Sequence, residues 1–329
     1  SYRNMAGYED YWSYTELPGG RGGAASVNNY NGNFIFSQPV TQDAGGNLMP
    51  VNISLIYNSN KENVSYSRVG AGMQTNYHMF IKQESGELWD NGYKYYLNDA
   101  DGTKHWFYFE NSSATQGKDE DGLGYTLKVI TLGSDTTEPN AKYVLTDKDK
   151  NKMYFDGYGC LARIVSPNGT NARVIYQLVD GARRIMRVID GAGRAYDFAY
   201  SSSNPDLVVS ISDPADRKTK LSYNSGKLIK ISFADGKNVQ FVYKNGLIIE
   251  IKGADGTRTK IGYDSSVQKR VSSYNYGYGS GNDEILEKYY FKYKQNETTV
   301  TDLRNRSYTI QFNDYGQTTG TVSNTDGSA

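Results

Sequence analysis

Two copies of one sequence unit stand end to end between Tyr223 and Tyr263. Both pass through the same landmarks in the same order, which are Tyr, Asn, Gly, an aliphatic run, Ala-Asp-Gly, an alternating run and a closing Tyr: YNSGKLIKISFADGKNVQFVY and YKNGLIIEIKGADGTRTKIGY. A unit of about 20 residues cannot bury its own apolar face, so consecutive units must stack and share a core. This tandem repeat constrains the fold more than any other feature of the chain.

Each unit is predicted to form two β-strands and two turns. Asn245-Gly246 and Asp255-Gly256 tolerate positive φ, and each pair separates two runs of alternating apolar residues, which is the strongest local signal for a hairpin. Alternation with a period of two buries one face of each strand. The residues expected in the core are Ile229, Ile231, Phe233, Val239, Phe241 and Tyr243 in the first copy, and Ile249, Ile251, Thr259, Ile261 and Tyr263 in the second.

The same unit is predicted to repeat along the second half of the chain. Its closing tyrosines are spaced by 20 to 24 residues, and its distal turns combine Gly or Pro with Asn or Asp, which suits the reversal of a strand. The closing tyrosines are Tyr154, Tyr176, Tyr200, Tyr223, Tyr243 and Tyr263, and the turn glycines are Gly169, Gly191, Gly236 and Gly256. We therefore expect an all-β fold of consecutive antiparallel hairpins in one long twisted sheet. A sheet of this many strands has to curl, so we expect a spiral or a partial shell.

The chain is predicted to have two regions, an opening segment at 1–150 with irregular hairpins and the repeat array at 151–329, joined in one continuous sheet. Residues 1–25 are rich in Gly and Tyr and are expected to form an extended lead-in laid over the body. Strands around Phe34 and at 51–57 are expected to form the first pair of a sheet. The charged, Gly-containing stretch 116–124 is expected to be an exposed loop.

Four motifs in the opening segment carry a family resemblance. They are DYWSY at 10–14, VNNYNGN at 27–33, NLMPVNISLIYN at 47–58 and TNY at 75–77. Together with the array at about 154–320, these motifs resemble bacterial Rhs/YD-repeat proteins, and the match is closest to the large wall-associated members. The Tyr-Asp dipeptide for which the repeats are named is kept among the closing residues only at Tyr263-Asp264.

The resemblance implies a secreted or cell-wall-associated bacterial polypeptide whose repeats build a shell, often around a C-terminal toxin domain used in contact-dependent competition. It implies a non-catalytic, structural role for this segment. Its partners would then be the remaining shell and the C-terminal domain of the same polypeptide. The abrupt start at Ser1 and the polar tail lead us to expect a fragment of something longer.

A second class of function is an extracellular adhesion or glycan-binding module. Tyr274, Tyr276 and Tyr278 alternate along the chain, so an extended backbone would display the three rings on one side. Such a platform could stack against sugar rings or a peptide of a cell-surface partner. Equally, the three rings would simply cover a sheet.

Composition argues against several other classes of protein. Lys and Arg together number 36, as do Asp and Glu, and they are scattered along the chain, so there is no electrostatic footprint for nucleic acid or anionic membranes. No run of about 18 apolar residues could span a membrane. The single cysteine, Cys160, rules out an internal disulfide and leaves the redox compartment undecided.

No group of residues has the spacing of a catalytic or metal site. His78 and His105 lie in aromatic, strand-like runs and are expected to be packed. Cys160 has no nearby histidine or basic cluster in the sequence to activate it. The stretches 99–102 and 119–122 superficially suggest calcium loops, but no ligand-spaced acid follows either, and turn chemistry explains both. We therefore expect no enzymatic activity, no cofactor and no metal.

Overall fold

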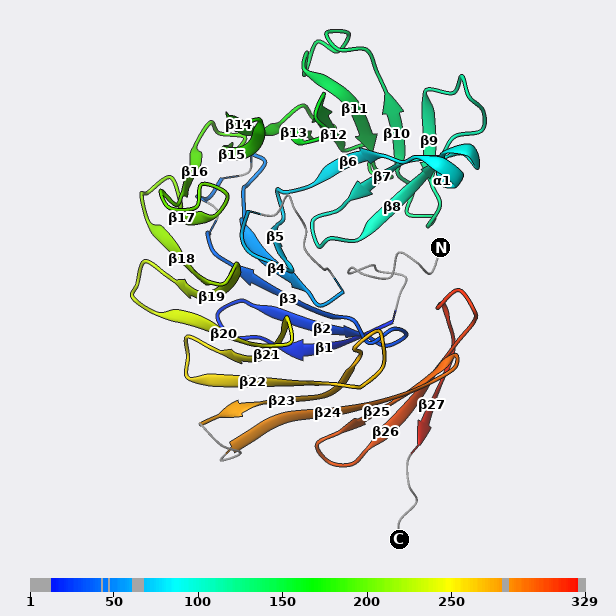
Figure 1. Cartoon of the computed structure of the whole chain (residues 1–329), viewed down its shortest axis with the longest axis vertical. Coiled ribbons are helices and arrows are strands. Elements are labelled where there is room, and N and C mark those ends of the chain that lie inside the picture. The colour runs from blue at the N-terminus through cyan, green and yellow to red at the C-terminus, as the bar shows by residue number, and fades with distance from the viewer. Residues whose placement is uncertain (1–12, 43, 47, 61–67, 280–283, 325–329) are drawn as a thin grey trace.

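The fold consists of two β-sheets, one lying inside the curve of the other (Figure 1). A computed structural model describes residues 13–42, 44–46, 48–60, 68–279 and 284–324. The smaller, five-stranded sheet, which we call the inner sheet, runs in chain order through β1 (Tyr14–Pro18), β2 (Ala24–Asn28), β3 (Phe34–Pro39), β4 (Ser54–Asn58) and β5 (Met73–Thr75).

The larger sheet, which we call the wall, contains 22 antiparallel strands. Its first part comprises β6 (Phe80–Gln83), β7 (Tyr93–Asn98), β8 (Lys104–Tyr108), β9 (Gln116–Asp119), β10 (Thr126–Val129), β11 (Ala141–Thr146), β12 (Lys152–Asp156), β13 (Leu161–Val165), β14 (Asn171–Val179), β15 (Ala182–Ile189) and β16 (Ala195–Tyr200). It continues with β17 (Val208–Ser212), β18 (Lys218–Asn224), β19 (Lys227–Ser232), β20 (Asn238–Lys244), β21 (Leu247–Lys252), β22 (Thr257–Tyr263), β23 (Val271–Tyr278), β24 (Glu284–Lys294), β25 (Glu297–Asp302), β26 (Ser307–Phe312) and β27 (Thr318–Asn324). The described residues contain one short helix, α1 (Gly86–Asp90).

The prediction of an all-β fold built on a long, curling antiparallel sheet is confirmed. Each strand from β7 to β26 pairs with the strands before and after it in the chain. Among the described strands, β6 pairs with β7 alone and β27 with β26 alone, so the sheet stays open. At the other end, β6 folds back onto the turn before β13. There the Ile81 amide donates to the Gly159 carbonyl at 2.8 Å and the Leu161 amide donates to the Met79 carbonyl at 3.2 Å.

One hydrophobic core fills the space between the inner sheet and the wall. Three large tyrosines, Tyr57, Tyr196 and Tyr274, are fully buried in it. A buried phenol needs a partner for its hydroxyl, and here the partners lie on the opposite sheet. The Tyr274 hydroxyl donates to the Pro18 carbonyl of the inner sheet at 2.7 Å, and the Ile248 amide of the wall donates to the Tyr57 hydroxyl at 3.1 Å.

A repeating hydrogen bond, which we call the tyrosine ladder, links the closing tyrosine of each wall unit to the first strand of that unit. The hydroxyl of the closing tyrosine donates to a backbone carbonyl 15 residues earlier in five successive units and 22 residues earlier in a sixth, always over 2.6 to 2.8 Å. The donor and acceptor pairs are Tyr176 and Leu161, Tyr200 and Ile185, Tyr223 and Val208, Tyr243 and Leu228, Tyr263 and Ile248, and Tyr293 and Val271. The closing tyrosines of 176–263 therefore occupy equivalent environments.

A β-bulge beside each closing tyrosine from Tyr176 to Tyr263 changes which aliphatic residue is buried. Tyr223 pairs with Leu228 while Ser222 pairs with Lys230, so Ile229 is an extra residue without a cross-strand partner in the register. Leu228 is consequently fully buried, and the expected core position of Ile229 was wrong. The same shift buries Ile248 in place of Ile249, because one extra residue reverses the alternation of faces.

Two positions at the start of the array differ from the expected pattern. Phe155, not Tyr154, lies opposite Leu161 across the first bulge and enters the main core. Tyr154 points to the other side of the sheet, where it packs with Ala141 and Val144. The ladder therefore begins at the Tyr176 hydroxyl.

The predicted turn glycines fall into two groups. Gly169, Gly236 and Gly256 adopt positive φ, as expected for reversing a strand. Gly191 does not, because the left-handed residue of its turn is Gly193. A Cβ at Gly191 would lie 2.9 Å from the Leu48 backbone, so this glycine instead permits close approach of the segment leading to the inner sheet.

The opening segment is organised differently from the lead-in that we expected. The described part of 1–25 contains β1 and β2, which lie within the concave side of the wall. The predicted pairing of the strands near Phe34 and 51–57 is present as the β3–β4 pair. The chain passes from the inner sheet to the wall between Thr75 and Phe80. Within the stretch 116–124, which we expected to be a loop, residues 116–119 form strand β9. Motif residues 10–12 and 47 lie outside the described residues.

The tyrosine ladder can be tested at the hydrogen bond between the Tyr243 hydroxyl and the Leu228 carbonyl. Tyr243→Phe removes the donor to the Leu228 carbonyl, and we expect the free energy of unfolding to fall by about 1 to 3 kcal/mol because a buried acceptor loses its partner. Tyr278→Phe is the matched control, since Tyr278 is 43% exposed, and it should change stability by less than about 0.5 kcal/mol. Urea denaturation measures both, and equal losses would contradict a role for the ladder hydroxyl.

The ladder also predicts loss of stability at high pH. Burial raises the pKa of the Tyr223, Tyr243 and Tyr263 phenols above the ordinary value of 10.0. A phenol whose pKa is higher in the folded than in the unfolded chain stabilises the fold fully below pH 10, and this stabilisation is lost as the pH rises. Absorbance at 295 nm, followed together with circular dichroism, should show ladder phenols ionising only as the sheet unfolds. Ionisation of all 30 tyrosines near pH 10 with the sheet intact would contradict this.

Candidate functional site

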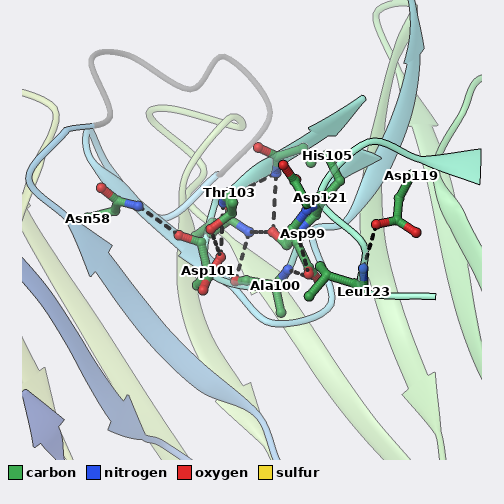
Figure 2. Close-up of polar contacts among 11 residues, drawn as sticks. Asn58, Asp99, Ala100, Asp101, Thr103, His105, Asp119, Asp121 and Leu123 are labelled. Atoms are coloured by element: carbon green, nitrogen blue, oxygen red, sulfur yellow. Dashed lines mark hydrogen bonds and ion pairs between the residues drawn. The ribbon is translucent and has the colours of Figure 1, made fainter. Parts of the chain in front are cut away.

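The two aspartate-rich stretches of the sequence come together around one histidine, as Figure 2 shows. His105 lies on β8 and is fully buried. Asp99 follows β7 in the tight turn 99–102, which closes with a hydrogen bond from the Gly102 amide to the Asp99 carbonyl. Asp121 lies on the loop after β9. The pairing of β7 with β8, and of β8 with β9, brings both carboxylates to the same ring.

His105, Asp99 and Asp121 form what we call the His105 clamp. The His105 Nε2 lies 3.1 Å from an Asp99 carboxylate oxygen, and Nδ1 lies 3.1 Å from an Asp121 carboxylate oxygen. The Asp121 side chain is 1% exposed. Burial alone would raise the pKa of the Asp121 carboxyl, but the hydrogen bond with His105 opposes it, and the pKa is lowered.

The clamp holds a joint between the inner sheet and the wall. Gln74 of β5 donates through its side-chain amide to the Asp99 and Ala100 carbonyls at 2.7 and 2.8 Å. Asn58 of β4 donates to the Asp101 carbonyl at 3.0 Å. The wall turn 99–102 is thus fixed on one side by the His105 ring and on the other by two amides of the inner sheet, those of Gln74 and Asn58. Figure 2 shows the contact of Asn58 with this turn.

The remaining acids near the clamp accept hydrogen bonds from their own turns. Asp101 accepts from the Thr103 amide and hydroxyl at 2.9 and 2.7 Å. Asp119 accepts from the Leu123 and Tyr125 amides at 2.7 and 2.8 Å. This is turn chemistry of the kind expected from the sequence. Among the described residues, no group of three or more histidines, cysteines or acids is arranged to hold a metal ion.

His78 has a separate environment. Its Nδ1 accepts a hydrogen bond from the Thr75 amide at 3.3 Å and lies 2.6 Å from the Thr75 hydroxyl. Burial lowers the pKa of His78 from 6.5 to about 3, so the ring stays neutral. The structure therefore uses the two histidines in different ways, one neutral beside a hydroxyl and one between two carboxylates.

Cys160 lines a small cavity of about 80 Å³ together with Tyr158, Tyr176 and Arg183. Arg183 lies near the thiol, which the sequence did not indicate, and its charge favours the thiolate. Burial and the nearby Asp156 act more strongly in the other direction and raise the pKa of Cys160 to about 11. At neutral pH the group is a protonated thiol and a poor nucleophile.

A larger cleft of about 610 Å³ separates residues 39–42 of the inner sheet region from the distal turns of the wall. Its charged groups are paired with one another. Arg21 lies 2.8 Å from Asp235 and Arg217 lies 2.6 Å from Asp213. These pairs hold the turns in place, and the cleft presents no adjacent nucleophile and base.

The three tyrosines considered as a binding platform lie in three different environments along β23. Tyr274 is fully buried and bonded to the inner sheet, Tyr276 is partly buried against the core, and Tyr278 is 43% exposed. A register shift between Tyr276 and Gly277 breaks the alternation on which the platform depends. The structure therefore does not bring the three rings together on an exposed face.

Comparison of the sequence with models of protein families finds no match, and comparison with curated proteins finds none either. Among solved structures, the chain is similar to the Tc holotoxin pore of Photorhabdus luminescens, with 14% identity, a TM-score of 0.33 and coverage of 92% of this chain and 15% of that chain. It is also similar to TcdB2-TccC3 (10% identity, TM-score 0.26, 87% and 16% covered). A third similar structure is TcdB2-TccC3 without its hypervariable C-terminal region (12% identity, TM-score 0.27, 95% and 16% covered).

These structural neighbours are chains of Tc toxin complexes, and this chain spans about 15% of the length of the first of them. At such identities and TM-scores, the function has to be argued from the geometry of this chain alone. Among the described residues, no helix has the length and apolar character needed to cross a membrane.

The state of Cys160 gives a direct test of this part of the structure. Because burial raises its pKa to about 11, the thiolate fraction at pH 8 should be about 100-fold smaller than in an unfolded chain whose thiol has a pKa near 9. We expect iodoacetamide to alkylate the folded chain correspondingly slowly, with a rate that rises until about pH 11. Mass spectrometry measures the rate, and the chain in urea is the control. Equal rates in the folded and unfolded chains would contradict the raised pKa.

Proposed function

We propose that this chain is a non-catalytic structural segment of a secreted or wall-associated bacterial Rhs/YD-repeat polypeptide. In this proposal, its wall forms part of a β-shell that encloses or presents a C-terminal toxin domain in contact-dependent competition. The observation that carries the structural role is the tyrosine ladder, which repeats the same hydrogen bond in successive units from Tyr176 to Tyr293. A regular wall of this kind can be lengthened by adding units without changing its contacts.

The inner sheet fills the concave side of the wall, and this bears on which part of a shell the segment would form. The inner sheet occupies the space inside the curve, and side chains of both sheets share one core. These wall units therefore have their concave surface covered by β1 to β5, and a cargo domain would contact other parts of the shell. We infer that this segment closes the shell and keeps solvent out of it.

The described residues give little support to the two alternative classes of function, an enzyme and a glycan-binding module. The two acids and the one histidine of the clamp lie against one another, so they do not converge on a substrate-sized space. The alternative of a glycan-binding module loses its platform, because Tyr274 lies in the core.

The proposal is tested on the full polypeptide from which this chain comes. Cryo-electron microscopy should show a hollow particle in which this segment forms one closed end, with further hairpin units continuing from it. Limited proteolysis should release the enclosed domain only after the shell is opened by denaturant. A particle in which this segment stands alone beside unrelated solid domains would overturn the proposal.

A further inference from the structure

The side of the wall that faces away from the inner sheet carries basic residues between β18 and β24. Alternation sends one set of side chains in these strands into the core and the other set to the convex side of the curve (Figure 1). Six basic residues on the convex side are exposed or half-buried and form what we call the basic face: Lys220, Lys230, Lys252, Arg258, Lys260 and Lys288. The chain has no net charge, so folding gathers on one face cations that are scattered in the sequence.

The strand register places these cations in rows that run across the sheet. In one row, Lys230 and Lys252 are the two cross-strand neighbours of Gln240. Arg258 continues this row on the next strand, opposite Lys252. Because neighbouring strands lie about 4.8 Å apart, cations recur along the row every 5 to 10 Å, roughly.

A second row runs beside the first. Lys260 and Lys288 are the two cross-strand neighbours of Asn275. Glu250 lies opposite Lys260, with its carboxylate 3.4 Å from the Arg258 Nε atom, and it is the acid that β18 to β24 place on this side among the described residues. The basic face therefore extends over about 30 Å of sheet with cations in clear excess.

The spacing of these cations determines which anions can use them. Like charges directly opposite each other, such as Lys252 and Arg258, destabilise a strand pair unless counter-ions neutralise them. Their separations are close to the Debye length of about 8 Å at physiological ionic strength, so the potentials of neighbouring cations add. A single phosphate would meet one or two cations, whereas a chain of phosphates would meet several at once and release the counter-ions of each.

We infer that the basic face binds a flexible linear phosphate polymer. Such a polymer can follow a convex, twisted sheet and reach the cations of both rows. Between the cations, Ser222, Ser232 and Asn275 offer side-chain donors for phosphate oxygens. This inference depends only on the wall of this chain, and it holds whatever a larger shell encloses.

The chemistry of the face favours this polymer over a nucleic acid or a lipid bilayer. Single-stranded nucleic acids bind through bases stacked on successive aromatic rings. Among the cations of the basic face lies one such ring, Tyr290, with the Lys288 Nζ atom 4.9 Å from its centroid. Binding of a peripheral protein to a bilayer gains from buried apolar area, whereas this face presents amines, a guanidinium, hydroxyls and amides, and a flat bilayer would touch only the crest of a convex sheet.

Long-chain inorganic polyphosphate is a probe for this site. Isothermal titration calorimetry between about 50 and about 200 mM salt should show binding that weakens steeply as salt increases. The triple variant Lys230→Gln/Lys252→Gln/Lys260→Gln should bind about tenfold more weakly or worse. Its plot of log K against log salt should become shallower by about 2, because each lost phosphate contact contributes about 0.7 to the slope.

The matched control is Lys82→Gln/Lys128→Gln/Lys152→Gln, which removes three exposed lysines from β6, β10 and β12. It causes the same loss of charge away from the basic face, so polyphosphate affinity should stay within about twofold of the wild type. Circular dichroism melts establish that both triple variants fold.

Glu250→Gln gives a measurement that a folding defect cannot imitate. It removes the acid from the basic face, so we expect polyphosphate to bind about twofold more tightly or better. Absence of polyphosphate binding at about 50 mM salt, or equal losses in the two triple variants, would overturn the inference. Tighter binding to phosphatidylglycerol vesicles or to single-stranded DNA at the same phosphate concentration would also overturn it.

Discussion

The hydroxyl of each closing tyrosine reaches back to a backbone carbonyl near the start of its own unit, and the rest of the wall depends on this contact. The acceptor is always the carbonyl of the aliphatic residue opposite the previous closing position, as for Tyr243 and Leu228. That aliphatic residue is fully buried, so the carbonyl it carries has limited access to water and gains from a fixed donor. The same side chain therefore closes its unit and holds the unit's last strand against its first strand, which in turn pairs with the previous closing tyrosine.

A wall of hairpins has a second requirement, because its concave apolar face must be covered. The inner sheet covers it with a core that is continuous across both sheets. Polar contacts at distant points fix their relative position. The Thr219 hydroxyl donates to the Val40 carbonyl at 2.7 Å and the Thr298 hydroxyl donates to the Asn29 carbonyl at 2.5 Å. Successive wall units thus meet successive parts of one small sheet, which makes the curvature of the wall a property of both sheets together.

The sequence predicted the hairpin repeat well, because turn residues and period-two alternation are local signals. The sequence wrongly predicts Ile229 in the core. A β-bulge depends on the pairing of two strands, so it cannot be recognised from the alternation pattern of one strand. The identity of Tyr154 predicts a closing residue, whereas the bulge places Phe155 opposite Leu161. A search for an aliphatic residue 15 positions before each closing tyrosine finds the first five hydrogen bonds of the ladder, whereas the sixth spans 22 residues.

Long-range contacts could not be predicted in the same way. The clamp joins Asp99, His105 and Asp121, and its turn is held by residues more than 20 positions earlier in the chain. Nothing in the local pattern around His105 distinguishes a ring between two carboxylates from an ordinary packed one. The buried position of Tyr274 likewise depends on the inner sheet, whose presence inside the curve is a property of the assembled fold.

The two ends of the wall are not equivalent. At β6 the Gly159 turn lies against the strand so closely that a Cβ at this glycine would lie 2.2 Å from the Ile81 carbonyl oxygen. At the opposite end, β27 carries no charged residue between Thr318 and Asn324, and its outer side borders no other described strand. Among the described residues, the edge of β6 is therefore occupied by the Gly159 turn, whereas the outer edge of β27 has no strand beside it and can accept one.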